Sequence, residues 1–472
     1  MSLNLVIPDR RRLPHAVSAE PPAAQRLRRA QHERLHTRLR DARFETDRLF
    51  GLLRGDSLLA RPLPDRARLI YYLGHLEAFD GTLLCRDGLG VRPFDREFDE
   101  LFARDRNPLA SGGPLDDRAS DWPSAPAIRV YGRKVRAAID AALESCAFGG
   151  RVAHPEARDC GAIELAIEHR LAIAEQIAVL IHHLPPSGKS HGPLPLAGGE
   201  ASANRWIDVS AGRTTLGLEK EASRFAQDIE YGAHDVQVKA FAIQSQNVTN
   251  GDFMKFVESR GYHDEGLWSR EGWAWRKAVG AEHPVFWQKK SGNWHYKAMF
   301  GEVVPLPKAL PVHVSRHEAE AYAKWTGSRL PTEAEFHRAA FGPITYQENG
   351  EGDRSFPWGE TAPWPSYGLF GFECWDAHPV GSHRAGDSPS GISDLVGNGW
   401  EWTSTSLGPH PGFTPSAAAP DVTKAAFSAG ATILKGASPR TSMSLIRRSF
   451  RHYSHPGHRH GYNTFRCVKS AE

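Results

Sequence analysis

Residues 394–403 read Asp-Leu-Val-Gly-Asn-Gly-Trp-Glu-Trp-Thr, in which a Gly-Asn-Gly turn leads into two tryptophans that flank a glutamate. The sequence around this stretch is rich in tryptophan and in loops, since twelve of the 13 tryptophans lie after residue 203. Short runs at 236–238 and 241–243 alternate like strands. Two capping boxes, Ser315-x-x-Glu318 and Thr332-x-x-Glu335, predict short helices. The second half is therefore predicted to be a loop-rich α+β domain.

The first half has helical periodicity instead. Residues 25–53 form an arginine-rich segment with leucines at helical spacing, and Pro64 is expected to open a second helix with an apolar stripe. Further helices are predicted at 130–145 and 161–184, with a loop at 91–127 between the second and the third. Four helices with one long crossover loop describe a helical bundle.

A stretch that contains several glycines, prolines and serines separates the two halves. We place the four-helix bundle at residues 22–186, the linker at 187–205 and the second domain at 206–470. The expected fold class is a multidomain α+β protein.

The composition limits the functions that this chain can have. Of its 472 residues, 40% are hydrophobic and 24% are charged, which excludes general disorder. The net charge of +3 is too small for a protein whose main task is to coat nucleic acid. No apolar run approaches the length of about 18 residues that spans a membrane, and the first twelve residues lack the apolar region of a secretory signal. The five cysteines include no Cys-x-x-Cys pair, which is typical of reduced cysteines in a cytoplasmic protein. Together with the charge and the short apolar runs, this pattern leads us to expect no membrane or nucleic-acid partner.

Seven motifs, two in the first half and five in the second, form recognisable patterns. They are Tyr71–Glu77, Glu168–Leu171, Val248-Thr249-Asn250-x-x-Phe253, Arg329–Glu335, Phe356–Gly359, Asp394–Thr403 and Phe465–Val468. With the last five, the second half is similar to the formylglycine-generating-enzyme-like, or sulfatase-modifying-factor, domain, whose fold is related to C-type lectins. With the first two, the first half resembles the DinB-like four-helix bundle that precedes this domain in ergothioneine-type sulfoxide synthases, the EgtB-like proteins.

This resemblance implies a non-haem iron(II) enzyme whose metal is held by three bundle histidines. The first ligand of the family matches His75. The other two come from a His-x-x-x-His-x-Glu motif, whose first histidine matches His169 and whose last residue matches Glu175. Residues i and i+4 share a helix face, so both imidazoles of such a motif can reach one ion. The second histidine, however, falls on Ile173, which cannot bind metal.

Other active-site positions of the family are also changed. Leu407 stands where the family commonly has a tyrosine that assists the oxygen chemistry. His452 and Tyr453 replace the Asn-Trp pair that helps to hold the betaine of the imidazole substrate. Because that loop faces the iron in the family, His452 is the candidate third ligand, and His452, Tyr453 and Trp402 are the candidate substrate-binding residues. We also expect the loop to pack over the mouth of the bundle, at the only large cleft of the molecule.

Two functions remain open at this point. The first is an O2-dependent iron oxidoreductase, similar to a sulfoxide synthase, that joins the sulfur of a thiol, or the selenium of a selenol, to the imidazole carbon of a histidine derivative. The second is a catalytically inactive family member that acts as a ligand-binding or assembly module. Formylglycine-generating activity is excluded, because the copper-binding cysteine pair is absent and Cys467 is the only cysteine after Cys374. Asn398 and Glu401 could form part of a structural calcium site, or serve as a turn and a buried anchor.

Overall fold

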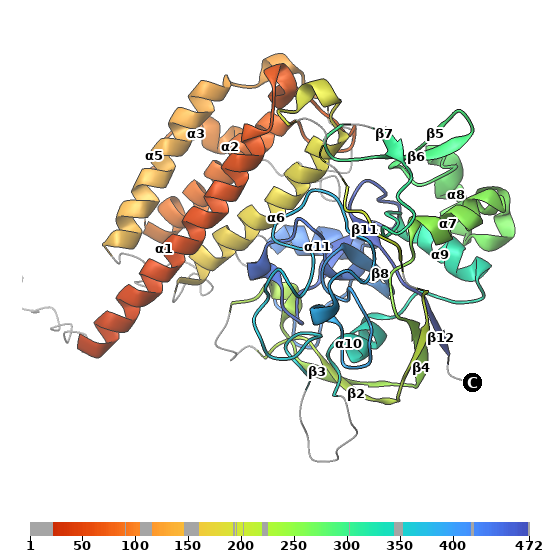
Figure 1. The fold of residues 1–472 in the computed structure, drawn as a ribbon. Helices are drawn as coiled ribbons and strands as arrows, with labels where there is room; N and C mark the ends of the chain where they lie inside the picture. Colours follow the sequence, from red (N-terminus) through yellow and green to blue (C-terminus); the bar gives the residue numbers. More distant parts are fainter. Residues whose placement is uncertain are drawn as a thin grey trace, which may run out of the picture.

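Long helices form the first part of the molecule, and short sheets and helices form the second part beside it (Figure 1). The computed structural model describes residues 22–89, 91–103, 116–145, 160–191, 194, 196–201, 203–219, 225–301, 303–343, 353–416 and 420–470. The first twelve residues, Cys146 and four residues of the predicted linker (192, 193, 195 and 202) lie outside the described residues. The predicted α+β class is confirmed.

Four long helices make up the bundle, and α3 (Arg96–Ala103) lies within the predicted crossover loop. The prediction that Pro64 opens the second helix is wrong. Leu63 and Ala67 are buried and the amide of Arg66 donates to the carbonyl of Leu63, so the chain makes a turn there before the helix begins. The second helix then continues directly into a π-helical segment (Gly81–Gly88), a rare form that often marks functional sites. The four helices are α1 (Pro22–Gly51), α2 (Leu69–Asp80), α5 (Ala125–Glu144) and α6 (Gly161–His183).

The second part contains four small sheets in its described residues. The stretch quoted first provides the turn before β8 and most of that strand, which is central in a sheet of order β10-β9-β8-β11. Strand β11 runs parallel to β8, whereas β9 runs antiparallel to both β8 and β10. The other sheets have the orders β1-β4-β12, β2-β3 and β5-β6-β7. The strands are β1 (Trp206–Val209), β2 (Gly212–Leu216), β3 (His234–Val238), β4 (Phe241–Gln244), β5 (Trp287–Lys290), β6 (Asn293–Lys297), β7 (Val303–Pro305), β8 (Gly399–Ser406), β9 (Thr432–Ala437), β10 (His452–Ser454), β11 (Asn463–Thr464) and β12 (Val468–Ser470).

Short helices surround these sheets. Both predicted capping boxes are confirmed. The Ser315 and Thr332 side chains accept hydrogen bonds from the amides of Glu318 and Glu335, and each glutamate side chain accepts one from the backbone amide of its cap residue. Among the described helices, none combines the length and the apolar character that crossing a membrane requires. The helices are α7 (Asn250–Glu258), α8 (Arg270–Val279), α9 (Arg316–Trp325), α10 (Glu333–Phe341) and α11 (Pro420–Ser428).

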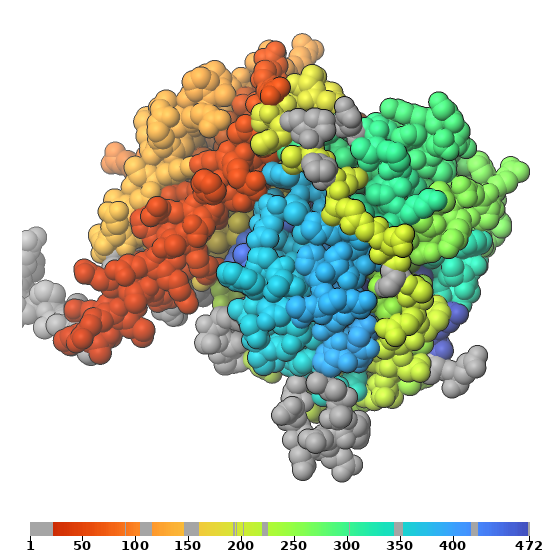
Figure 2. Space-filling model, in the orientation of Figure 1, coloured from red at the N-terminus to blue at the C-terminus, as the bar shows by residue number. Residues whose placement is uncertain are grey.

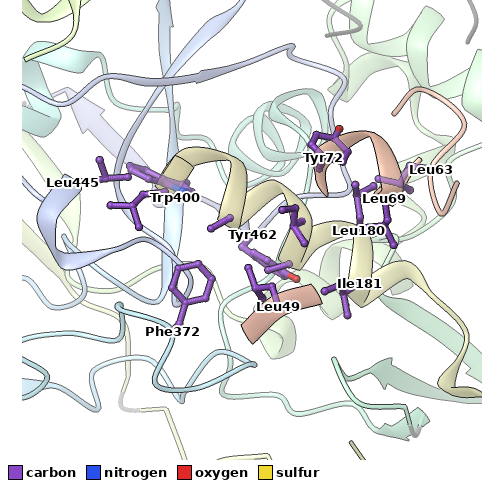
Figure 3. Packing of buried hydrophobic residues seen from close by; sticks show 14 of the residues in the cluster. Leu49, Leu63, Leu69, Tyr72, Leu180, Ile181, Phe372, Trp400, Leu445 and Tyr462 are labelled. Carbon is purple, nitrogen blue, oxygen red and sulfur yellow. The ribbon is translucent and has the colours of Figure 1, made fainter. Parts of the chain in front are cut away.

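The two parts share one hydrophobic core. A single cluster of buried residues includes Leu49 and Leu180 of the bundle together with Trp400 and Tyr462 of the second part. Figure 3 shows α6 running between Trp400 and Phe372 on one side and bundle residues such as Leu69 on the other. On the surface, α1 lies directly against the segment coloured light blue in Figure 2, and the Arg48 guanidinium lies 4.8 Å from the Trp375 ring centroid. Helix α6 therefore belongs to both parts, and it carries the candidate site.

Candidate functional site

Two bundle histidines on neighbouring helices approach each other through their Nε2 atoms. The Nε2 atoms of His75 on α2 and His169 on α6 lie 3.2 Å apart, and both residues are half-buried. This distance confirms the prediction that the two imidazoles approach each other across the bundle. Two nitrogens that each lie about 2.1 Å from a metal, at an angle of about 90–110°, are separated by about 3.0–3.4 Å. The observed spacing fits two adjacent ligand positions on one metal ion.

The protein orients the ring of His75 through its other nitrogen. Nδ1 lies 2.8 Å from the carbonyl oxygen of Phe102 and 3.0 Å from the hydroxyl of Tyr71. A carbonyl can only accept, so this bond places the proton on Nδ1 and leaves the Nε2 lone pair directed at His169. Gly74 makes the arrangement possible, because a Cβ atom there would lie 2.3 Å from the Phe102 ring. Helix α3 thus sets the tautomer of His75 by close packing on α2.

His169 is held mainly by stacking and burial. The Phe79 ring lies 3.7 Å from its ring centroid at an angle of 15°, and its Nδ1 atom has no hydrogen-bond partner among the described residues. Burial, and then repulsion by His75, lower the pKa of His169 well below its ordinary value. The imidazole is therefore neutral, which is the form that binds metal.

Ion pairs fix α6 against α2 beside the histidines. Arg170 is fully buried and donates to Asp80 and to Glu77, both on α2. Burial alone would raise the pKa of Glu77, but Arg170 and Arg136 outweigh it and lower that pKa to about 2. Gly132 on α5 allows this approach, since a Cβ there would lie 2.9 Å from Cγ of Glu77. The helices that carry His75 and His169 therefore cannot slide without breaking buried ion pairs.

Among the described residues, no third metal ligand accompanies this pair. Ile173, one turn after His169, packs against the shared hydrophobic core. In the part of the chain that the structure describes, no three histidine, cysteine, aspartate or glutamate side chains are placed to hold one metal ion. The residues present thus fit a two-histidine site whose remaining positions a substrate, water or another group must fill.

A second polar face of α6 joins the bundle to the sheets. Glu168, Glu175 and His182 are spaced by seven residues, so they lie on one side of the helix. Glu168 and Glu230 both bind Arg447, which is buried between them. We call this side of α6, with its partners, the domain seam.

At the middle of the domain seam, Glu175 accepts three hydrogen bonds from the sheet region. Trp400 Nε1 donates at 2.8 Å, Ser438 Oγ at 2.5 Å and Thr441 Oγ1 at 3.0 Å. Burial raises the pKa of Glu175, and these bonds partly offset that effect. The last residue of the family motif is thus an interdomain anchor in this chain.

Comparison with known proteins identifies the family. A model of the sulfatase-modifying factor enzyme 1-like domain matches residues 196–471. A hercynine oxygenase from Mycolicibacterium smegmatis is 32% identical over 406 residues, which cover 83% of this chain and 89% of that protein. The chain belongs to the hercynine oxygenase family. The predicted resemblance is therefore confirmed.

Two further relatives match a smaller share of the chain. Hercynine oxygenases from Mycolicibacterium thermoresistibile and Mycobacterium tuberculosis are each 37% identical over 51% of this chain. The matched regions are 53% and 55% of the relatives' own lengths, so the chain spans about half of each.

In this member of the hercynine oxygenase family, the three predicted substrate residues lie in different surroundings. His452 stacks on Trp400 at 4.6 Å and is not grouped with His75 and His169, while burial lowers its pKa to about 4. Tyr453, the next residue of β10, packs instead with Leu407 and its apolar neighbours. Trp402 is fully buried and donates to the carbonyl of Val314. The alternation of side chains along a strand separates His452 from Tyr453, which spacing alone did not reveal.

The predicted calcium ligands have protein partners. Both oxygens of Glu401 accept from Arg466, and each residue of this pair is fully buried. The amide side chain of Asn398 bonds to both backbone groups of His378, and its φ of 66° forms a turn. A guanidinium already balances the charge that calcium would neutralise, so the turn and the buried anchor describe these residues better.

The loop after β10 reaches the bundle as expected, although it covers the ends of helices. His183 Nε2 donates to the carbonyl of His460, Tyr462 donates to His182 Nδ1, and the Arg66 side chain lies 3.5 Å from His458.

The expectation that a cleft between the parts is the only large one is wrong. Hollows of about 270 and 370 Å3 lie elsewhere, one beside Arg205 and Ser393 and the other beside Ser57 and Pro185.

Proposed function

We propose that this protein is an O2-dependent non-haem iron enzyme that forms a carbon–sulfur or carbon–selenium bond on the imidazole of a histidine derivative. The single observation that supports it most is the pair of Nε2 atoms, 3.2 Å apart, on helices locked by buried ion pairs. The similarity to hercynine oxygenases supports a histidine-derived substrate.

The residues of the chain would prepare the site before any chemistry. His75 presents a lone pair because Phe102 holds its Nδ1 proton, and Phe79 restricts the rotation of His169. Iron(II) bound by both imidazoles would supply the redox chemistry that couples a thiolate to the imidazole at the expense of O2. Ile173 and the surrounding core keep this side of α6 apolar, which limits access of water.

Metal content tests the proposal most directly. Protein that is purified without oxygen and loaded with iron(II) should retain about one iron per chain, and His75→Ala and His169→Ala should each lose it. His182→Ala serves as the matched control, because His182 lies on the same helix but in the domain seam. Iron retention that is equal in all four proteins would contradict the assignment.

A second function is favoured by one specific observation. Ile173 packs into the core where the family has a ligand, and the described residues provide no third metal ligand. A catalytically inactive member that binds a histidine-derived ligand without metal would need only the pocket, not the iron. Binding of the ligand at full strength to strictly metal-free protein, together with no turnover after iron loading, would support this function over the first.

A further inference from the structure

Arg440 is a buried cation that forms no direct ion pair with a described carboxylate. It is 1% exposed, and its Nε and Nη2 atoms have no hydrogen-bond partner among the described residues. No described carboxylate lies within ion-pair distance of its guanidinium, which rests on the face of Tyr462 at 3.6 Å from the ring centroid. A buried charge that is neither paired nor hydrogen-bonded is strongly unfavourable, so such a group calls for a partner.

Three other buried arginines show what that partner is in this domain. Arg447, Arg451 and Arg466 each place the same edge of the guanidinium, Nε and Nη2, on the two oxygens of one glutamate. This side-on arrangement gives two parallel N–H···O bonds and is the geometry in which arginine recognises a carboxylate. In Arg440, no described residue accepts a hydrogen bond from Nε or Nη2.

The Tyr462 ring under the guanidinium places this edge at the domain seam, because the Tyr462 hydroxyl bonds to His182 on α6. Its backbone amide donates to Ser438 Oγ, and Ser438 in turn donates to Glu175 on α6. Glu175 follows His169 by six residues, a rise of about 9 Å along the helix. The guanidinium also lies close enough to Glu175 and Asp376 to influence both, although the oxygens of these carboxylates are bonded to other groups.

We propose that Arg440 anchors a carboxylate of the substrate in the domain seam through its Nε and Nη2 atoms. The inference rests on the proposed function only in the choice of substrate, which would be an amino acid. The same carboxylate chemistry belongs to the imidazole substrate and to an amino-acid thiol such as cysteine. Tyr462 covers one face of the guanidinium and leaves its edge for the ligand.

Binding to metal-free protein tests this assignment separately from catalysis. The probes are trimethylated histidine and its decarboxylated counterpart, and, in a second arm, L-cysteine and cysteamine, each measured by calorimetry. Wild type should bind the carboxylate-bearing member of one pair at least tenfold more tightly than its decarboxylated partner. Arg440→Gln should lose that preference while its affinity for the decarboxylated compound stays unchanged, and Arg440→Lys should keep part of it.

The controls separate binding from folding. Arg384→Gln, an arginine exposed on the sheet side, should behave as wild type. Comparing the two probes on wild type needs no variant, so a failure of Arg440→Gln to fold does not prevent the test.

A preference seen only in the first arm assigns the carboxylate to the imidazole substrate, and one seen only in the second assigns it to the thiol. Equal binding of both members of each pair, or no binding, would make Arg440 a structural cation held by Tyr462. Because no iron is present, either outcome leaves the metal assignment to be decided by its own experiment.

Discussion

The two polar faces of α6 differ in how completely their side chains are paired. In the domain seam, Glu168 binds Arg447 and Glu175 accepts three hydrogen bonds. His169 lies about 100° around the helix from Glu168, and its described partners are the His75 imidazole and the Phe79 ring. The side chain of Ile173, on the same face as His169, has no polar atom. Polar groups that serve the fold are normally satisfied by the fold, whereas groups kept for a ligand are left open. One face of α6 therefore joins the two parts of the molecule through paired groups, whereas the other carries the histidine at which we propose that metal binds.

The largest test breaks the domain seam. Arg447→Met leaves Glu168 and Glu230 buried without the cation that they share, which should cost about 3–5 kcal/mol of the free energy of unfolding. Urea denaturation at neutral pH measures this loss. The neighbouring Arg448, which is only partly buried and donates to one carbonyl, provides the matched control. A loss no greater than that of Arg448→Met would show that the seam does not depend on this ion pair.

The second test restores the missing ligand on the other face. Ile173→His places a second imidazole one turn from His169, so iron(II) affinity should rise by about 3 kcal/mol, or more than a hundredfold, given about 10–16 kcal/mol for four-ligand sites. Anaerobic titration of wild type and variant measures the change. Ala172→His adds the same side chain at a different angle on the helix and should not reproduce the gain. Weak binding by both histidine variants would mean that the pocket has closed around the isoleucine.

The third test uses the pH dependence of stability to compare a buried histidine, His313, with an exposed one, His263. Burial, and then Arg440, lower the pKa of His313 to about 3. Between pH 6.5 and pH 3, His313 is protonated in the unfolded chain and neutral in the folded chain. The free energy of unfolding therefore decreases as the pH falls below about 6.5. At pH 5 this one residue should cost about 2 kcal/mol.

The measurement is the difference in unfolding free energy between pH 7.5 and pH 5.0. His313→Asn should reduce that difference by about 2 kcal/mol. His263→Asn, at an exposed position, should leave it unchanged. An identical pH dependence in all three proteins would show that His313 is not buried as a neutral group.

The smallest effect is expected from one hydrogen bond of the seam. Trp400→Phe removes the indole N–H that Glu175 accepts, which should cost about 1.5 kcal/mol, because the bond is to a carboxylate. The loss should fall when Glu175→Gln is already present, and a double-mutant cycle measures this coupling. Iron affinity should stay unchanged if the seam serves only the fold. A large loss of iron affinity would instead show that the domain seam and the histidine pair are energetically coupled.

Local sequence patterns determined the elements and the family. The helical periodicity of the first half, the capping boxes at Ser315 and Thr332, and the motif from Asp394 to Thr403 depend on neighbours in the chain. The same applies to the loss of a ligand at Ile173, since an i, i+4 motif is local to one helix. Pro64 was the exception, because burial of Leu63 and Ala67 decided where α2 begins.

Only the tertiary structure decided which distant groups meet. The carbonyl of Phe102 orients His75, and Ser438 donates to Glu175, although each pair is far apart in the sequence. The family resemblance predicted that His75 and His169 approach each other, but only the structure gives the distance between them. Strand alternation sent Tyr453 away from His452, although the two are adjacent in the chain. The physical reason is that hydrogen bonds and ion pairs act over a few ångströms in space, while sequence spacing reports only the geometry of a single helix or strand.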